Sequence, residues 1–390
     1  MIEAASLVDQ CCHGVLRTEL GLGTFEAQLG RVPGPAAPGT TFFDTQTGFA
    51  VRRWCPPLLG LDPHCSPARY LARRRELGTL EVAGRLLRST GISTYLVDTG
   101  APGDLTRPDE LAVAGQAAAH EIVRLEPLAE RVADVSGSVA GFLAGFAEAV
   151  HTAARSAVAF SSVAFTPVDG NGLGNGDGAV AGYGLAAAPD PPGPGEARGA
   201  AGRWLAGRRT GSPPTDPVLL RHLLWTAVAS GLPLHLHTGA PGAYRTAGHA
   251  DPLPLTGFAT ATAGLGTALV LSASPPYHRH TAHLTSVFPH VYADLGSALT
   301  HTGAGASAVL AQMLELAPFG KLLFSSGARG LPELHVVGAR VFREALARVL
   351  GGWVADGAWS PGDARRVAGM IAAGNARRLY GLSDGGPSDR

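Results

Sequence analysis

The sequence predicts an α/β fold, a (β/α)8 TIM barrel with a long low-complexity loop after its fourth strand. Two observations favour this fold. Eight short and nearly continuous apolar runs alternate with amphipathic segments, which is typical of parallel strands covered by helices. The chain has 390 residues, a length that suits one barrel of this kind. We therefore expect residues 1–390 to form a single barrel domain.

The expected strands are short runs rich in Val, Leu, Ile and Phe. They lie at residues 6–10, 93–98, 120–126, 157–165, 232–237, 267–272, 290–295 and 321–326. Between them, apolar residues recur at helical spacing in residues 67–89, 138–155, 216–231 and 305–317. The alternation predicts parallel strands joined by helical crossovers.

The C-terminal helix has recognisable boundaries. Ser360 is placed to cap its first turn, and Pro361 suits the first helical position. Asp363 falls in the first turn, where a negative charge suits the helix dipole. Gly381 is placed to end the last helical stretch.

Two segments do not fit the repeat. Residues 18–56 are rich in Gly, Pro and Thr, and we expect them to form a loop insertion over the barrel mouth. Residues 169–216 follow the fourth strand and are low in complexity. Because this composition offers little apolar area to bury, we expect a flexible Gly/Pro-rich loop.

The composition indicates which kinds of partner the protein has. Hydrophobic residues make up 45% of the chain, formal net charge is zero and the pI is about 7.3. This balance does not favour nucleic acid or an anionic membrane, and no apolar stretch is long enough to span a membrane. Four cysteines in a long chain do not form a disulfide framework, and no secretory signal is visible. We expect a cytoplasmic protein with a small-molecule substrate or ligand, and a homo-oligomer is left open.

Two pairs of side chains could hold a metal ion. Cys11 and His13 end the first strand, and His235 and His237 end the fifth. Residues two apart in a strand point the same way, so each pair can face the mouth of a barrel. Four nitrogen and sulfur ligands suit tetrahedral zinc. The alternative is that His235 is a packed core histidine and Cys11 a small buried hydrophobe.

A histidine-rich stretch follows the sixth strand. His278 and Arg279 come directly after that strand, where a basic pair could bind the carboxylate of a substrate. His280 and His283 are three apart on an expected helix, and we expect them to face solvent.

Seven stretches, in this order, resemble the amidohydrolase-related family, the metal-dependent hydrolases of the amidohydrolase superfamily. They read LVDQCCHGVL, STYLVDTG, HEIVRLE, LPLHLHTG, PPYHRHTAHLTSVFPHVYADLG, APFGKLLFSSGARGLPELHVVGAR and GNARRLYGL. The resemblance covers most of the chain outside residues 169–216. It implies a TIM barrel that catalyses hydrolysis, or occasionally decarboxylation or isomerisation, at a divalent metal, which lowers the pKa of bound water. Within that range, we expect hydrolysis of a non-peptide C–N bond of a small molecule.

Carried over by position, the resemblance implies an altered metal site. The family motif D-x-H-x-H falls on residues 9–13, so His13 is kept and Cys11 replaces a histidine. The fifth-strand histidine falls on His237, and His235 is available beside it. The chain is then expected to bind either one divalent ion, zinc by ligand type, or none.

Three other family positions are substituted. The fourth-strand lysine falls near Ser161, the sixth-strand histidine near Ala273, and the eighth-strand aspartate on Gly327. That aspartate is usually the base in the family, so no catalytic residue is assigned here. Asp294 and Glu333 are the nearest carboxylates by sequence, and Glu333 is a candidate substrate ligand. Two hypotheses follow: a hydrolase with a rebuilt metal site, or an inactive barrel that binds a ligand or partner without metal.

Overall fold

The computed structural model describes residues 6–30, 36–101, 103–164, 188–238 and 251–383. Within them, eight strands form one sheet in chain order, β1 to β8. Their bounds are β1 Leu7–Cys12, β2 Ile92–Asp98, β3 Ala118–Arg124, β4 Ala159–Ser162, β5 Leu234–Leu236, β6 Leu269–Ser272, β7 Val291–Asp294 and β8 Leu322–Leu323.

The neighbouring strands pair in parallel, as predicted. β1 pairs with β2, β3 with β4, β4 with β5 and β5 with β6, all in parallel register. Eight parallel strands in sequential order, with helices between them, are the (β/α)8 TIM barrel, and the predicted fold class is confirmed. Each strand overlaps the run in which it was predicted.

The end of β1 also forms backbone hydrogen bonds with the segment that follows β8. The Gln10 N–H donates to the Phe324 carbonyl over 3.1 Å, and the His13 N–H donates to the Ala328 carbonyl over 2.8 Å. These bonds bring the end of β1 beside the segment that follows β8. Residues from the two ends of the sequence can therefore share one site.

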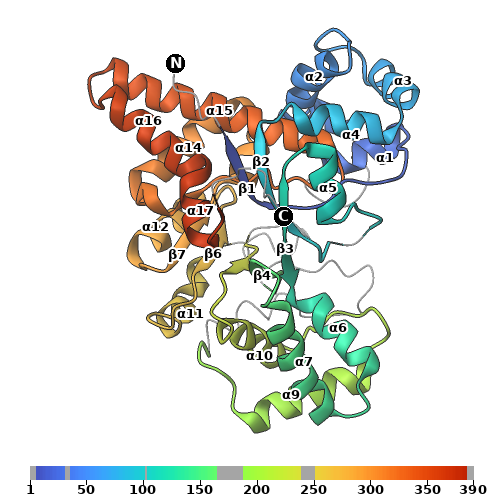
Figure 1. The fold of residues 1–390 in the computed structure, drawn as a ribbon, viewed down its shortest axis with the longest axis vertical. Helices are drawn as coiled ribbons and strands as arrows, with labels where there is room; N and C mark the ends of the chain where they lie inside the picture. Colours follow the sequence, from blue (N-terminus) through green and yellow to red (C-terminus); the bar gives the residue numbers. More distant parts are fainter. Residues whose placement is uncertain (1–5, 31–35, 102, 165–187, 239–250, 384–390) are drawn as a thin grey trace. The chain divides into compact units, whose positions relative to one another are not determined.

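The chain divides into two compact units, residues 1–120 with 294–390 and residues 121–293. The helices of the first unit are α1 Leu22–Leu29, α2 Gln46–Leu58, α3 Pro67–Leu77, α4 Thr79–Arg88, α5 Pro108–Gly115, α13 Gly296–Thr300, α14 Ala306–Leu316, α15 Pro332–Ala355, α16 Pro361–Gly369 and α17 Asn375–Tyr380. The long helix α15 packs against α2, α4, α13 and α14. Figure 1 shows α15 beside α4. Residues Met370–Gly374 form a π-helical turn between α16 and α17.

The segment 18–56 differs from the predicted loop, because it contains α1, a 3₁₀ turn at Phe42–Asp44 and most of α2. Phe25 and Phe43 are buried and stack with ring centroids 5.9 Å apart. The Thr45 hydroxyl caps α2 by accepting from the Gly48 N–H. A few well-spaced aromatic and capping residues thus order the described parts of this segment, residues 18–30 and 36–56, despite its content of Gly, Pro and Thr.

The second unit contains α6 Leu125–Val135, α7 Val139–Ala153, α9 Pro194–Gly207, α10 Pro217–Val228, α11 Thr256–Ala261 and α12 His278–Val287. α9 lies within the segment 169–216 that was predicted to be a flexible loop. Its face of Ala197, Ala200, Ala201 and Trp204 is buried. Small alanines let the helix approach its neighbours closely, so low complexity does not prevent burial here. Residues 169–187 of the predicted loop lie outside the described residues.

Helix boundaries follow the predicted signals. The Ser360 side chain accepts from the Asp363 N–H at the start of α16, and Gly381 ends α17 in the left-handed conformation, with φ 64°. The predicted helix at residues 67–89 is divided into α3 and α4 at Gly78, whose φ is 80°.

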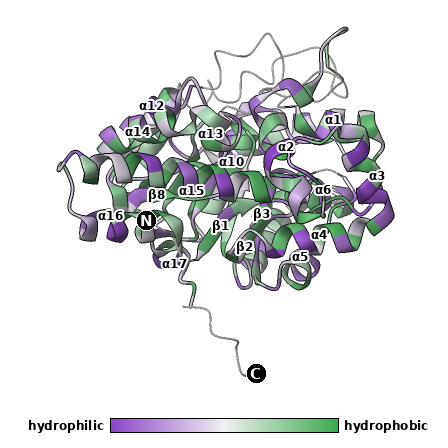
Figure 2. Ribbon diagram, turned by 90° about the horizontal axis from the view of Figure 1, so that it is seen from above, coloured by the Kyte–Doolittle hydropathy of each residue, from purple (hydrophilic) through white to green (hydrophobic). Residues whose placement is uncertain are grey.

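Strands and surface helices differ in hydropathy within the first unit. Figure 2 shows green, hydrophobic residues along β2, whereas α3 carries purple, hydrophilic residues. Among the described residues, no helix combines the length and the apolar character that crossing a membrane requires.

Candidate functional site

His13 follows β1 directly, and a neighbouring carbonyl fixes its ring. The Nδ1 atom of His13 lies 2.9 Å from the Asp98 carbonyl oxygen at the end of β2. Because only an N–H can bond to a carbonyl, Nδ1 carries the proton and Nε2 of the neutral ring carries the lone pair. This is the arrangement in which a metal-binding histidine is usually held. Cys11, two residues earlier, is buried with 4% exposure.

The second predicted ligand pair lies on β5, in the other unit. His235 is 2% exposed and pairs in register with Ser161 of β4 and Val270 of β6. His237 follows the strand, is half-buried, and donates its N–H to the Ser162 carbonyl over 3.1 Å. Cys11 and His13 thus belong to one unit and His235 and His237 to the other. The four-ligand metal site stays a prediction.

The substituted family positions are all occupied by small residues. Ser161 is buried in β4, and Ala273 is buried after β6. Gly327, after β8, adopts a φ of 60°, a left-handed conformation that side chains rarely take. A Cβ atom at this position would lie 3.5 Å from the Ser297 backbone nitrogen, an ordinary contact, so the φ angle and not a lack of space favours glycine. The backbone here is therefore shaped around a glycine.

Asp294 is a buried carboxyl at the end of β7. Its Oδ1 accepts hydrogen bonds from the Gly296 N–H, over 2.9 Å, and from the Ser325 hydroxyl, over 2.7 Å. Burial raises the pKa of Asp294 to about 6, and the charge of Asp9 adds to the shift while the hydrogen bonds oppose it. This carboxyl can take up or release a proton near neutral pH.

Glu333 lies in the first turn of α15 and is fully buried. Its Oε1 accepts from the Tyr70 hydroxyl over 2.7 Å and lies 2.7 Å from Arg74 Nε. The Arg74 guanidinium in turn lies 5.2 Å from the centre of the Phe25 ring. These contacts are internal to the protein, and the substrate-binding role of Glu333 stays a prediction.

The histidine-rich stretch forms the start of α12. His278 is buried and Arg279 is exposed, and their role in carboxylate binding stays a prediction. His283 faces solvent, whereas His280 is partly exposed and its Nδ1 lies 2.9 Å from Asp251 Oδ1.

A further group of side chains was not predicted. Asp9 and Cys12 of β1 and His335 of α15 each offer a ligand atom, and these three atoms lie within 4.8 Å of one another. The Asp9 carboxylate also accepts from the Ser326 N–H over 2.8 Å and from the Ser326 hydroxyl over 2.5 Å. Burial first, and the Asp9 charge second, raise the pKa of the Cys12 thiol well above its usual value. Asp9 and Ser326 are 317 residues apart, so spacing in the sequence gives no sign of the group.

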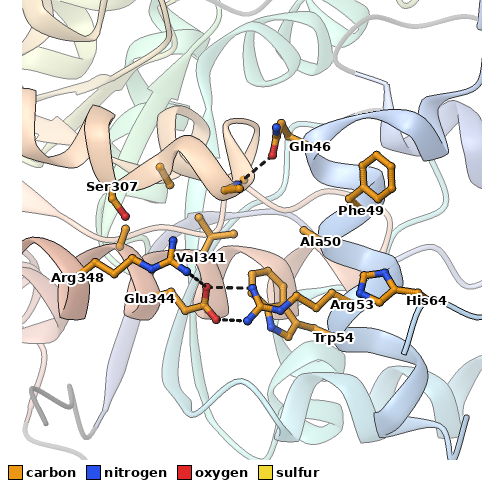
Figure 3. Close-up of a pocket in the computed structure, with 14 residues that line it drawn as sticks. Gln46, Phe49, Ala50, Arg53, Trp54, His64, Ser307, Val341, Glu344 and Arg348 are labelled. Carbon is orange, nitrogen blue, oxygen red and sulfur yellow. Dashed lines mark hydrogen bonds and ion pairs between the residues drawn. The ribbon is translucent and has the colours of Figure 1, made fainter. Parts of the chain in front are cut away.

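A pocket of about 130 Å³ lies elsewhere in the first unit, between α2, the start of α14 and α15. Figure 3 shows Glu344 between the two arginines Arg53 and Arg348. The Arg53 guanidinium bonds both oxygens of Glu344, over 3.1 and 2.6 Å. None of the predicted site residues lines this pocket.

Comparisons with known proteins bear on the family and the fold. The family model described as Amidohydrolase matches residues 177–382. A solved structure from Lactobacillus casei ATCC 334, assigned as a metal-dependent hydrolase, superposes with a TM-score of 0.79 at 22% identity. The superposition covers 97% of this chain and 96% of the Lactobacillus casei chain.

A uronate isomerase and a glucuronate isomerase share the fold more distantly. Uronate isomerase of Thermotoga maritima gives a TM-score of 0.61 at 12% identity, covering 96% of this chain and 94% of its own. Glucuronate isomerase of Caulobacter crescentus gives 0.60 at 13% identity, covering 98% of this chain and 92% of its own. At these identities the three structures show a common fold alone.

One curated protein also matches by sequence. Protein fluG of Emericella nidulans is 34% identical over 121 residues. The match covers 31% of this chain and 14% of that protein, so the chain spans a small part of its length.

Proposed function

The chain belongs to the amidohydrolase family, and from this premise we propose that it hydrolyses a non-peptide C–N bond of a small molecule, at a divalent-metal site altered from the family pattern. The observation that supports the proposal best is the His13 ring, whose Nδ1–H is held by the Asp98 carbonyl. A histidine fixed in this way presents Nε2 as a ligand without further reorganisation.

The donor set suits a divalent ion. Cys11, His13, His235 and His237 would hold it, and one thiolate with imidazoles is a ligand set that zinc accepts. The bound ion would polarise the scissile carbonyl and supply a hydroxide-like water. A small-molecule partner and a cytoplasmic location belong to the same proposal.

The chain's own residues would handle the substrate and the proton. His278 and Arg279 would bind a substrate carboxylate as a basic pair. Gly327 provides no carboxylate after β8, so Asp294 is the group that we place as proton acceptor. It bonds Ser325, two residues before Gly327, and its pKa of about 6 leaves it largely ionised at neutral pH.

An inactive ligand-binding barrel is the second candidate. The observation that favours it is the left-handed backbone of Gly327, together with the buried Ala273. Both positions carry polar metal-site residues in the family resemblance, and neither offers a side chain that could replace them.

Metal analysis separates the two candidates. We expect about one zinc ion at this site in purified protein, lost in Cys11→Ala and in His13→Gln. The matched control is His151→Gln, which alters an exposed histidine on α7. A protein that contains no divalent metal, and whose unfolding midpoint ignores chelators, would contradict the hydrolase proposal, because a bound ion stabilises the native state.

A further inference from the structure

His335 is a buried imidazole without a good hydrogen bond. Its side chain is fully buried, and Nε2 has no partner among the residues that the structure describes. Nδ1 lies 3.4 Å from both Asp9 Oδ2 and the Ser326 hydroxyl, which is longer than an ordinary hydrogen bond. The nitrogen that faces Asp9 and Ser326 is therefore Nδ1, which has only these long contacts, and a group that bonds it at shorter distance would lower the cost of burying the ring.

The neighbours of His335 are metal ligands. Asp9, Cys12 and His335 are all fully buried, and their ligand atoms lie within 4.8 Å of one another. Zinc bonds of about 2.0–2.3 Å place tetrahedral ligand atoms about 3.3–3.8 Å apart. The most distant of the three atoms would therefore need to approach one another by about 1 Å on binding. The Tyr95 ring packs edge-on against His335 at 5.6 Å and limits how far the imidazole can turn.

Charge and chemistry both favour a divalent cation of intermediate softness. A thiolate and a carboxylate together balance two positive charges, so the buried group would be neutral with the ion in place. One sulfur, one nitrogen and one oxygen ligand suit zinc. The Ser326 hydroxyl, 2.5 Å from Asp9 Oδ2, is within reach as a fourth ligand.

We propose that Asp9, Cys12 and His335 bind a structural zinc ion that joins β1 to the first turns of α15. On binding, the Cys12 thiol loses its proton to solvent and the sulfur becomes a zinc ligand. This site does not depend on the proposed hydrolytic centre, which uses Cys11 and His13 instead.

The test counts zinc per chain by elemental analysis of purified protein. We expect Cys12→Ser and His335→Gln each to contain about one zinc ion fewer than the unaltered protein. The matched control is Cys55→Ser, which changes another fully buried free thiol of the same unit and should keep the ion. Equal zinc in all four proteins would overturn the proposal.

Two further measurements keep the result unambiguous. Zinc that is lost in Cys11→Ala but kept in Cys12→Ser would belong to the hydrolytic centre, and would also overturn the proposal. If the variants fail to fold, anomalous diffraction at the zinc edge from crystals of the unaltered protein decides the matter. A peak bounded by Asp9, Cys12 and His335 supports the site, and no peak there overturns it.

Discussion

Arg74 and Glu333 form an ion pair that is almost fully removed from water. Arg74 is 9% exposed and Glu333 is not exposed at all. Burying two charges gains little by itself, because desolvation offsets their attraction. Removing one partner is different, since the remaining charge is left buried and unpaired.

We therefore predict that Arg74→Met lowers the free energy of unfolding by about 3–5 kcal/mol. Arg74→Met combined with Glu333→Gln should recover much of that loss, because no isolated charge remains. Chemical unfolding followed by circular dichroism measures both. The control is Arg85→Met, which breaks an exposed pair with Glu81 and should change little. A loss in Arg74→Met no larger than in this control would contradict the prediction.

Asp294 makes stability depend on pH. Its pKa is raised from 3.8 to about 6, so the folded protein keeps a proton that the unfolded chain has lost. The raised pKa of Asp294 thus adds to the free energy of unfolding fully below about pH 4, and this added stability is lost as the pH rises through about 6. Asp294→Asn cannot ionise and should not show this loss.

Relative to Asp294→Asn, the unaltered protein should lose about 2 kcal/mol of unfolding free energy between pH 4 and pH 7. Denaturant titrations at several pH values measure it. A difference that stays constant over this window would show that Asp294 titrates normally.

At the level of the elements, Trp204 is the largest side chain that α9 buries. Trp204 is 7% exposed, and its ring centroid lies 5.4 Å from that of Phe142 on α7. Its indole N–H donates to the Pro213 carbonyl over 3.3 Å. The helix therefore depends on this contact more than on its own alanine- and glycine-rich sequence.

We predict that Trp204→Ala destabilises the protein by about 3–5 kcal/mol and exposes residues 194–207 to limited proteolysis. Arg198→Ala, an exposed change on the same helix, should leave both unchanged. Equal cleavage of the two variants within α9 would show that Trp204 is not needed to keep this helix folded.

The strands could be predicted from sequence more fully than the helices. A buried strand such as β2 contains a short apolar run, Tyr95 to Val97, and this signal is local. The 24-residue helix α15 was not predicted, because it is buried on several sides and its apolar residues do not mark one face. α9 was missed because its buried face is mostly alanine.

For the molecule as a whole, the candidate sites differ in how far they can be predicted from the sequence. Cys11 and His13 are neighbours in the chain, so their spacing alone suggests ligands. Asp9 and His335 meet only because the end of β1 lies beside the segment that follows β8, and no local pattern records that contact. The bond from His13 to the Asp98 carbonyl likewise depends on the pairing of β1 with β2.

If the protein is a metal-dependent hydrolase, its turnover of a small-molecule amide depends on the metal and on His13. The experiment follows cleavage of a panel of small non-peptide amides by metal-stripped protein, by the same protein with zinc restored, and by His13→Gln with zinc added. We predict turnover that appears on restoring the metal and is absent from His13→Gln. Folded, metal-supplemented protein that cleaves no amide on the panel, or that cleaves equally well without metal, would show that the protein is not a metal-dependent hydrolase of such amides.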